Sequence, residues 1–235
     1  MKQIIKFWDR LSESYDSIPG HGITQDIDKT IWKLLFNNLL KKDKLKILDF
    51  GCGTGALSFI LSESGHDVLG IDISEKMINK SKIKNCTTNT SLNFKKINIK
   101  NINKTSYFDL VISRHVFWTL VNPIETLQKI HSLLKPCGNI IIIDADWYEE
   151  NTYKNISVNS NTDYCDDVKK NLPLINLKRP KTDFILLKET GFCDIHIIND
   201  LLSHVSSKFK VNPEKIQSFD QNISQFLIMA SKNEI

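Results

Sequence analysis

The chain has 235 residues, a formal net charge of +4, 41% hydrophobic residues and 25% charged residues. This length suits one α/β domain, and the mild charge, spread between elements, forms no basic stripe typical of nucleic-acid binding. No apolar run reaches the roughly 18 residues of a membrane span, and the N-terminal segment carries charges instead of an apolar signal core. We therefore expect a cytoplasmic domain over residues 1–235, without nucleic-acid or membrane partners and with its oligomeric state open.

Five cysteines are scattered along the chain without a Cys-x-x-Cys pair. In a reducing compartment such cysteines are most simply free thiols, and no histidine stands at zinc-finger spacing. We predict neither a disulfide framework nor a metal site.

The N-terminal part of the chain alternates helical and strand patterns. Residues 3–15 and 27–42 have the periodicity of amphipathic helices, separated by the turn "SIPGHG". The apolar run 45–50 predicts a buried strand, followed by a helix that ends at Gly65. Further strands are expected at 67–72, 92–98, 108–114 and 139–146.

Helix-start signals follow the second and fourth of these strands. Ser74 can cap the helix "EKMINKSKIK", and Pro123 suits the first turn of the helix "IETLQKIHSLLK". This regular alternation predicts a doubly wound, largely parallel α/β sheet.

The second half breaks the alternation. Residues 147–180 are polar and poorly periodic, so we expect a partly helical excursion over the ligand-binding edge of the sheet. A helix near 181–190 follows, and strands at 194–200 and 224–232 close the sheet as an antiparallel pair. The stretch 201–223 between them reads as a loop with at most a turn of helix. The expected parts are a helical cover (1–43), a ligand-binding core (44–146), the insertion (147–180) and the C-terminal strands (181–235).

A glycine loop, "LDFGCGTGALS", follows the first strand. Gly51, Gly53 and Ala56 fit the dinucleotide pattern G-x-G-x-x-G/A, which alone is weak evidence. Asp49 discriminates, because a carboxylate beside the loop repels a pyrophosphate and suits an ammonium group. Asp72, at the end of the second strand, can accept hydrogen bonds from both ribose hydroxyls. A ligand with a ribose, an ammonium group and no phosphate is S-adenosylmethionine.

Each acid alone has a plainer structural explanation. Asp49 suits a buried acid stabilised by loop amides, and Asp72 suits an acid at a helix start. The combination of both acids at adjacent strand ends favours the ligand.

Five segments then resemble the class I, Rossmann-like, S-adenosylmethionine-dependent methyltransferases. They are "FWDRLSESYD", "ILDFGCGTGALS", "VLGIDIS", "FDLVISRHVFWTL" and "LLKPCGNIIIIDADWY", and the resemblance runs from about Phe7 to Lys232. The first and last are similar to small-molecule methyltransferases of ubiquinone-biosynthesis type. The resemblance implies a seven-stranded mixed sheet of order 3-2-1-4-5-7-6, with strand 7 antiparallel, a helical N-terminal cover and an insertion after strand 5.

The resemblance also implies roles for individual residues around the cofactor. Three glycines line the methionine portion, Asp49 faces its amino group, and Asp72 binds the ribose. Ile73 packs on the adenine, and Tyr15 is a lid residue over the methionine end. The three glycines are Gly51, Gly53 and Gly55.

Two positions depart from the family pattern. Asn98 stands where an acid often binds the adenine amino group, and its side-chain oxygen can still accept a hydrogen bond without charge. Cys137 stands in "KPCG" where "KPGG" is usual. Since a cysteine takes φ > 0 poorly, we expect Gly138 to carry that turn.

For the acceptor side, His115 is the candidate general base, since it follows the fourth strand and a histidine titrates near neutral pH. Arg114 suits a substrate carboxylate, and aromatic walls are expected from Trp118, Trp147 and Tyr148. Plainer readings stay open: His115 pairs with backbone, and Trp118 simply packs. The acids and aromatics of 147–180 favour a cationic or amine acceptor.

Three other functions stay open at this point. The glycine loop also suits an NAD-dependent oxidoreductase, although Asp49 argues against it. A non-catalytic S-adenosylmethionine-binding module has the same loop. A macromolecular acceptor is a further alternative, but "SRHVF" stands where many enzymes that methylate nucleic-acid amino groups have (D/N)PP(Y/F).

Overall fold

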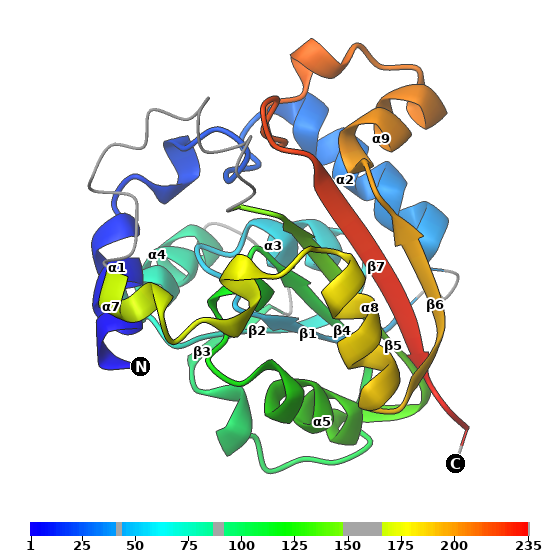
Figure 1. Ribbon diagram of the computed structural model, residues 1–235. Coiled ribbons are helices and arrows are strands. Elements are labelled where there is room, and N and C mark those ends of the chain that lie inside the picture. Colours follow the sequence, from blue (N-terminus) through cyan, green and yellow to red (C-terminus); the bar gives the residue numbers. More distant parts are fainter. Residues whose placement is uncertain (41–43, 87–91, 148–165, 235) are drawn as a thin grey trace.

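The structure is a computed structural model that describes residues 1–40, 44–86, 92–147 and 166–234. Seven strands form one sheet in the order β3-β2-β1-β4-β5-β7-β6, and β7 runs antiparallel to both neighbours (Figure 1). The expected mixed sheet is confirmed. Its strands are β1 (Lys46–Phe50), β2 (Asp67–Asp72), β3 (Asn93–Lys96), β4 (Phe108–Arg114), β5 (Leu134–Ala145), β6 (Phe192–Ile198) and β7 (Gln225–Lys232).

Helices cover both faces of the sheet, which is why its central strands are continuous apolar runs. One apolar core joins the sheet to α2 and α3, and the second joins it to α5 and α8. In Figure 1, α5 and α8 lie in front of the sheet and α2 and α3 behind it. The helices are α2 (Asp26–Leu39), α3 (Ala56–Glu63), α4 (Glu75–Asn85), α5 (Pro123–Leu133), α8 (Lys181–Glu189) and α9 (Leu201–Phe209).

The expected helix boundaries rest on local hydrogen bonds and backbone conformation. The Ser74 hydroxyl accepts the Met77 N–H at 3.2 Å and starts α4, and Pro123 occupies the first turn of α5. Gly65 follows α3 with φ of +94°, a left-handed conformation that glycine adopts without strain. These three signals are confirmed.

The stretch 201–223 contains a helix, so its interpretation as a loop is wrong. The Asp200 carboxylate accepts the Ser203 N–H at 3.0 Å and begins α9. Leu201 and Val205, four residues apart, are fully buried on one face of α9. Packing of this short apolar face against the core stabilises a helix that the local sequence pattern indicates only weakly.

The turn near residue 137 is also different from the expectation. Strand β5 begins at Leu134, and Cys137 itself has φ of +57°. Gly138 cannot be replaced easily for another reason: a Cβ there would lie 2.8 Å from the Lys135 carbonyl oxygen. The pairing with β4 shifts register between Phe108 and Leu110, and this irregularity accommodates the left-handed cysteine.

An N-terminal cover packs beside the sheet. It consists of α1 (Lys2–Leu11) and the 3-10 turn η1 (Tyr15–Ser17), where we expected one helix over 3–15. In Figure 1, α1 lies next to α7 (Asp166–Lys169), and the two segments share a small apolar core. The described part of the insertion therefore packs against the cover through apolar residues such as Val168 and Leu172. Residues 148–165 lie outside the described part of the chain.

Within the described ranges, no helix is long and apolar enough to cross a membrane. The cysteines at 52, 86, 137 and 193 are free thiols, and Cys165 is outside the described residues. No cluster of potential metal ligands occurs in the described part of the chain.

Candidate active site

A cavity of about 230 Å³ opens at the carboxyl ends of β1, β2 and β4, beneath the N-terminal cover. This edge is where open α/β sheets bind their ligands. One cavity wall contains both predicted cofactor-binding residues and the predicted general base. From the predicted set it includes Tyr15, Gly51, Gly53, Asp72, Ile73, Asn98, Arg114 and His115.

The glycine loop is shaped by two close approaches. Gly51 has φ of +71°, and a Cβ there would lie 2.3 Å from the Val116 side chain. Gly53 has φ of +54° and lies in the cavity wall, where a Cβ would be in ordinary contact with Tyr15 at 3.7 Å and Met77 at 4.0 Å. Gly51 therefore lets the loop after β4 approach, while glycine at position 53 suits the left-handed backbone.

Gly55 has a different position from the other two glycines. It has φ of +91° and caps α3, and a Cβ there would lie 2.8 Å from Phe94. Gly55 is not in the cavity wall, so its direct role with the methionine portion stays a prediction.

Asp72 is oriented by the backbone of two neighbouring loops. Its carboxylate accepts the Gly53 N–H at 3.0 Å and the Ser74 N–H at 2.8 Å. Burial raises the pKa of this carboxyl to about 6, against the lowering effect of those backbone hydrogen bonds. Each carboxylate oxygen retains a lone pair that can accept a ligand hydroxyl.

Asp49 lies beneath the glycine loop and outside the cavity wall. It is only 2% exposed, and its carboxylate accepts the Ser58 hydroxyl at 2.5 Å. Burial raises the pKa of Asp49 to about 7, and the nearby Asp72 adds to this rise. Asp49 can act on a ligand ammonium by its charge, and direct contact with that group stays a prediction.

Two further predicted residues line the cavity at the ends of β2 and β3. Ile73 presents an apolar side chain there, next to Met77, which the sequence analysis missed. The Asn98 side-chain oxygen accepts the Lys100 N–H at 3.0 Å. This bond occupies one of the two lone pairs of that oxygen, so the proposed contact with an adenine amino group depends on the other.

His115 follows β4 in a left-handed conformation, with φ of +59°. Its backbone N–H donates to the Ile143 carbonyl oxygen at 2.9 Å. Neither nitrogen of its imidazole ring has a hydrogen-bond partner among the described residues. The imidazole is 4% exposed, and burial holds its pKa well below the usual range, with the Arg114 charge adding to this effect. His115 is therefore neutral at pH 7, but burial makes it a weaker base than an exposed histidine, contrary to the expected titration near neutral pH. Its role as the general base stays a prediction.

Arg114 holds the cover in place. Its guanidinium donates to the Gly20 carbonyl and, at 3.0 Å, to the Ser218 carbonyl. The guanidinium carbon lies 5.1 Å from the Trp32 ring centroid. No local sequence pattern indicated this positioning role, and the binding of a substrate carboxylate by Arg114 stays a prediction.

Trp118 and Trp147 stand beside His115 and are joined to Asp144 of β5. The Trp147 indole N–H donates to Asp144 at 2.7 Å, and its ring lies 4.9 Å from the His115 ring. The Trp118 indole N–H donates to the His115 carbonyl at 3.1 Å. Neither indole is part of the described cavity wall, and Tyr148 lies outside the described residues.

The cover is fastened over the glycine loop by polar contacts. Asp16 accepts the Thr54 hydroxyl at 2.5 Å and pairs with Lys84 at 2.6 Å. Asp9 accepts the Ser74 hydroxyl at 2.6 Å. These contacts place Tyr15 in the cavity wall, although they join segments too far apart for sequence reasoning to find.

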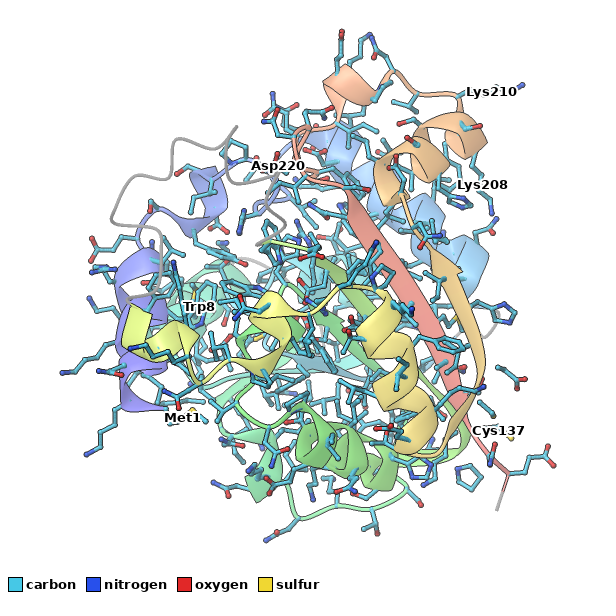
Figure 2. The ribbon with its side chains drawn as sticks, viewed as in Figure 1. Met1, Trp8, Cys137, Lys208, Lys210 and Asp220 are labelled. Atoms are coloured by element: carbon cyan, nitrogen blue, oxygen red, sulfur yellow. The ribbon has the colours of Figure 1, made fainter. Side chains whose placement is uncertain are left out.

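Apolar residues of α1 complete the wall on the cover side, and the sequence analysis missed them. Met1, Ile4 and Trp8 line the cavity. Figure 2 shows Trp8 on the inner side of α1, and its ring lies 6.2 Å from the Trp118 ring. Their spacing of three and four residues, which places them on one face of a helix, was the sequence signal that could have identified them.

The profile of the methyltransferase-domain family Methyltransf_31 matches residues 41–179, more than half of the chain. This protein belongs to that methyltransferase family. The chain therefore carries a methyltransferase domain of this family, with the Rossmann-like sheet described above. The open expectation of an oxidoreductase is set aside.

Curated relatives of this methyltransferase match part of the chain. It is 33% identical over 98 residues to the ubiquinone biosynthesis O-methyltransferase of Colwellia psychrerythraea, covering 41% of this chain and 40% of the relative. It is 32% identical over 136 residues to the putative methyltransferase YqeM of Bacillus subtilis, covering 56% and 52%. The matched region thus spans about half or less of these relatives.

Among solved structures, this methyltransferase is similar to phosphoethanolamine N-methyltransferase 2 of Haemonchus contortus in complex with S-adenosyl-L-methionine. The TM-score is 0.65 at 17% identity, over 96% of this chain and 57% of that one. At this identity the similarity establishes the fold alone.

Proposed function

We propose that this methyltransferase transfers the methyl group of S-adenosylmethionine to a small-molecule acceptor held beside His115. The observation that carries the proposal is the single cavity wall that contains both Asp72 and His115. Relatives named for ubiquinone biosynthesis and for phosphoethanolamine methylation support an acceptor of small size. The enclosed aromatic surroundings of His115 support a site that excludes water.

The chemistry of the cavity wall fits the cofactor. The backbone of Gly51 and Gly53 in the cavity wall can face its methionine portion, and the Asp72 carboxylate can accept the ribose hydroxyls. Ile73 and Met77 provide apolar surface for the adenine. Asp49, buried below the loop, contributes negative charge toward the ammonium group.

When bound, the cofactor supplies an electrophilic sulfonium methyl group. On transfer, the acceptor would give its lone pair to the methyl carbon, and the electron pair of the carbon–sulfur bond would leave with sulfur. Holding both groups in one cavity would orient them, and such orientation can contribute about 7–11 kcal/mol toward the barrier. Neutral His115 then takes the proton that the acceptor loses.

The test combines cofactor binding with methyl transfer. Binding of S-adenosylhomocysteine is measured by calorimetry for the wild type, Asp72→Asn and the control Asp67→Asn, whose residue lies at the opposite end of β2. We expect Asp72→Asn to weaken binding by about 1.5–3 kcal/mol, the contribution of a hydrogen-bonded charged group, and the control to have no effect. Transfer of a radiolabelled methyl group to pools of small molecules is measured in parallel.

Unchanged affinity in Asp72→Asn would remove the ribose assignment. Transfer to a protein or nucleic-acid pool, with none to small molecules, would overturn the proposed acceptor class.

A further inference from the structure

Two buried polar side chains at the acceptor side have no hydrogen-bond partners. All four side-chain nitrogen and oxygen atoms of His115 and Gln225 are buried without a partner among the described residues. Gln225 is 1% exposed and His115 is 4% exposed. Burying unpaired polar groups is costly, so most such groups in folded proteins are satisfied, and exceptions often mark sites for ligands.

The sheet brings these two residues together. Gln225 begins β7 and pairs with Ala145 of β5, and His115 follows β4 with its N–H bonded to Ile143 of β5. The Gln225 amide lies close enough to favour the protonated form of the imidazole, which opposes the lowering of its pKa. No hydrogen bond of normal geometry joins them, so the amide and the imidazole are close neighbours whose polar atoms have no well-formed partner among the described residues.

The surroundings of the pair are aromatic and carry positive charge. The rings of His21 and Trp147 lie 5.1 and 4.9 Å from the His115 ring. Burial lowers the pKa of His21 to about 4, so this imidazole is also neutral at pH 7. The Arg114 charge acts on both imidazoles. A cation is disfavoured at this position, in contrast to the amine acceptor that the composition of 147–180 suggested.

We propose that His115 and Gln225 together bind the hydroxyl group of an uncharged aromatic acceptor. This inference rests on the proposed function and names its acceptor class. A hydroxyl both donates and accepts, which matches a neutral imidazole nitrogen and a primary amide. The flat ring of the acceptor packs against the aromatic rings around His115, and the hydroxyl proton passes to His115 as the oxygen is methylated.

The His21 ring lies beside His115 and is partly exposed. Its Nδ1 lies 3.0 Å from the Pro19 carbonyl oxygen, and its ring packs edge-on against Tyr15, with the ring centroids 5.0 Å apart. His21 thus belongs to the aromatic surroundings of the pair.

The experiment compares three probes of similar size on the protein saturated with S-adenosylhomocysteine. Phenol carries the hydroxyl, toluene replaces it by a methyl group, and benzylammonium carries a positive charge. Dissociation constants are measured by NMR from the shifts of the Gln225 amide and His115 ring signals. We expect phenol to bind at least tenfold more tightly than toluene or benzylammonium, and to shift both sets of signals.

The variant Gln225→Met keeps the length of the side chain and removes its hydrogen-bonding groups, and Gln217→Met is the control on an exposed loop. We expect Gln225→Met to reduce the preference for phenol over toluene to less than threefold, with unchanged affinity for S-adenosylhomocysteine. Its melting temperature stays equal to that of the wild type or rises, because an unpaired buried amide is removed. A merely structural glutamine would lower the melting temperature instead.

Equal binding of phenol and toluene, tighter binding of benzylammonium, or an unchanged preference in Gln225→Met would overturn the hydroxyl site. Any of these results alongside normal cofactor binding would leave the proposed methyl transfer intact. Failure of S-adenosylhomocysteine to bind would instead contradict the proposed function.

Discussion

At the scale of single residues, backbone conformation limits what can occupy this site. His115 has φ of +59°, a region that most side chains avoid and that asparagine tolerates better than others. An alanine substitution would therefore mix the loss of the imidazole with backbone strain. Asparagine keeps the backbone and a polar side chain but provides no base, so it is the more informative substitution.

We expect His115→Asn to lower kcat for methyl transfer by roughly 10²–10⁴-fold, the usual contribution of a general base. Its dissociation constant for S-adenosylhomocysteine should stay within about twofold of the wild type, because His115 lies on the acceptor side. Steady-state kinetics and calorimetry provide the two readouts. Full activity in this variant would show that no base acts there.

Cofactor affinity should increase with pH. Burial raises the pKa of Asp72 to about 6 and that of Asp49 to about 7, so both carboxyls are largely protonated at pH 5 and ionised at pH 8. The ammonium group of the cofactor attracts the ionised forms and lowers these pKa values, so binding near pH 6.5 releases protons. Calorimetry of S-adenosylhomocysteine binding in buffers of different ionisation enthalpy measures this release.

The same two carboxyls have the opposite effect on the folding stability of the protein without cofactor, which should fall as pH rises. A carboxyl whose pKa is raised by folding is protonated in the folded state while it is already ionised in the unfolded state. Between about pH 4 and 7, these two groups therefore make stability fall as pH rises. Asp49→Asn should reduce the pH dependence of cofactor affinity and that of folding stability. Cofactor binding that is independent of pH in the wild type would contradict this account.

At the scale of elements, a buried ion network fastens the segment before α8 to the end of β5. Arg179 pairs with Asp144 at 3.0 Å and with Asp183 at 2.5 Å, and all three side chains are almost fully buried. Asp144 also accepts the Trp147 indole N–H. The network thus connects α8 to an aromatic ring beside His115.

We expect Arg179→Met to destabilise the fold by about 3–5 kcal/mol, because it leaves two carboxylates buried without their cation. The matched control is Lys100→Met, which breaks an exposed pair with Glu125 and should cost at most about 1 kcal/mol. Chemical denaturation measures both changes. Equal stability of the two variants would show that the buried network is not held together by Arg179.

At the scale of the whole molecule, the cavity is built from parts that are distant in sequence. The cover contributes Tyr15, the sheet contributes Asp72, and the loop after β4 contributes His115. A ligand that contacts all three parts binds the folded state and has no equivalent site in the unfolded chain. Cofactor binding should therefore stabilise the protein as a whole.

At a concentration 100 times its dissociation constant, S-adenosylhomocysteine should add about 2.7 kcal/mol to the free energy of unfolding. For a chain of this size that corresponds to a rise of roughly 5–10 °C in melting temperature. NAD is the control ligand and should give no rise, because the Asp49 carboxylate disfavours a pyrophosphate on the glycine loop. A thermal shift with NAD alone would contradict the assignment of the glycine loop.

The sequence alone was enough to predict the strands, the glycine loop and the two acids, because each depends on local patterns: apolar strand runs, glycines and acids at strand ends. The sheet order followed from the resemblance to a known family. The sequence did not predict α9, which depends on packing against the core, or the left-handed Cys137, which depends on an irregular strand pairing. Only the tertiary structure brought Gln225 to His115, tied Arg114 to the cover and placed Asp49 below the cavity. These relations join residues distant in sequence, and side-chain burial and unpaired hydrogen-bonding groups exist only once the strands and their cover are assembled.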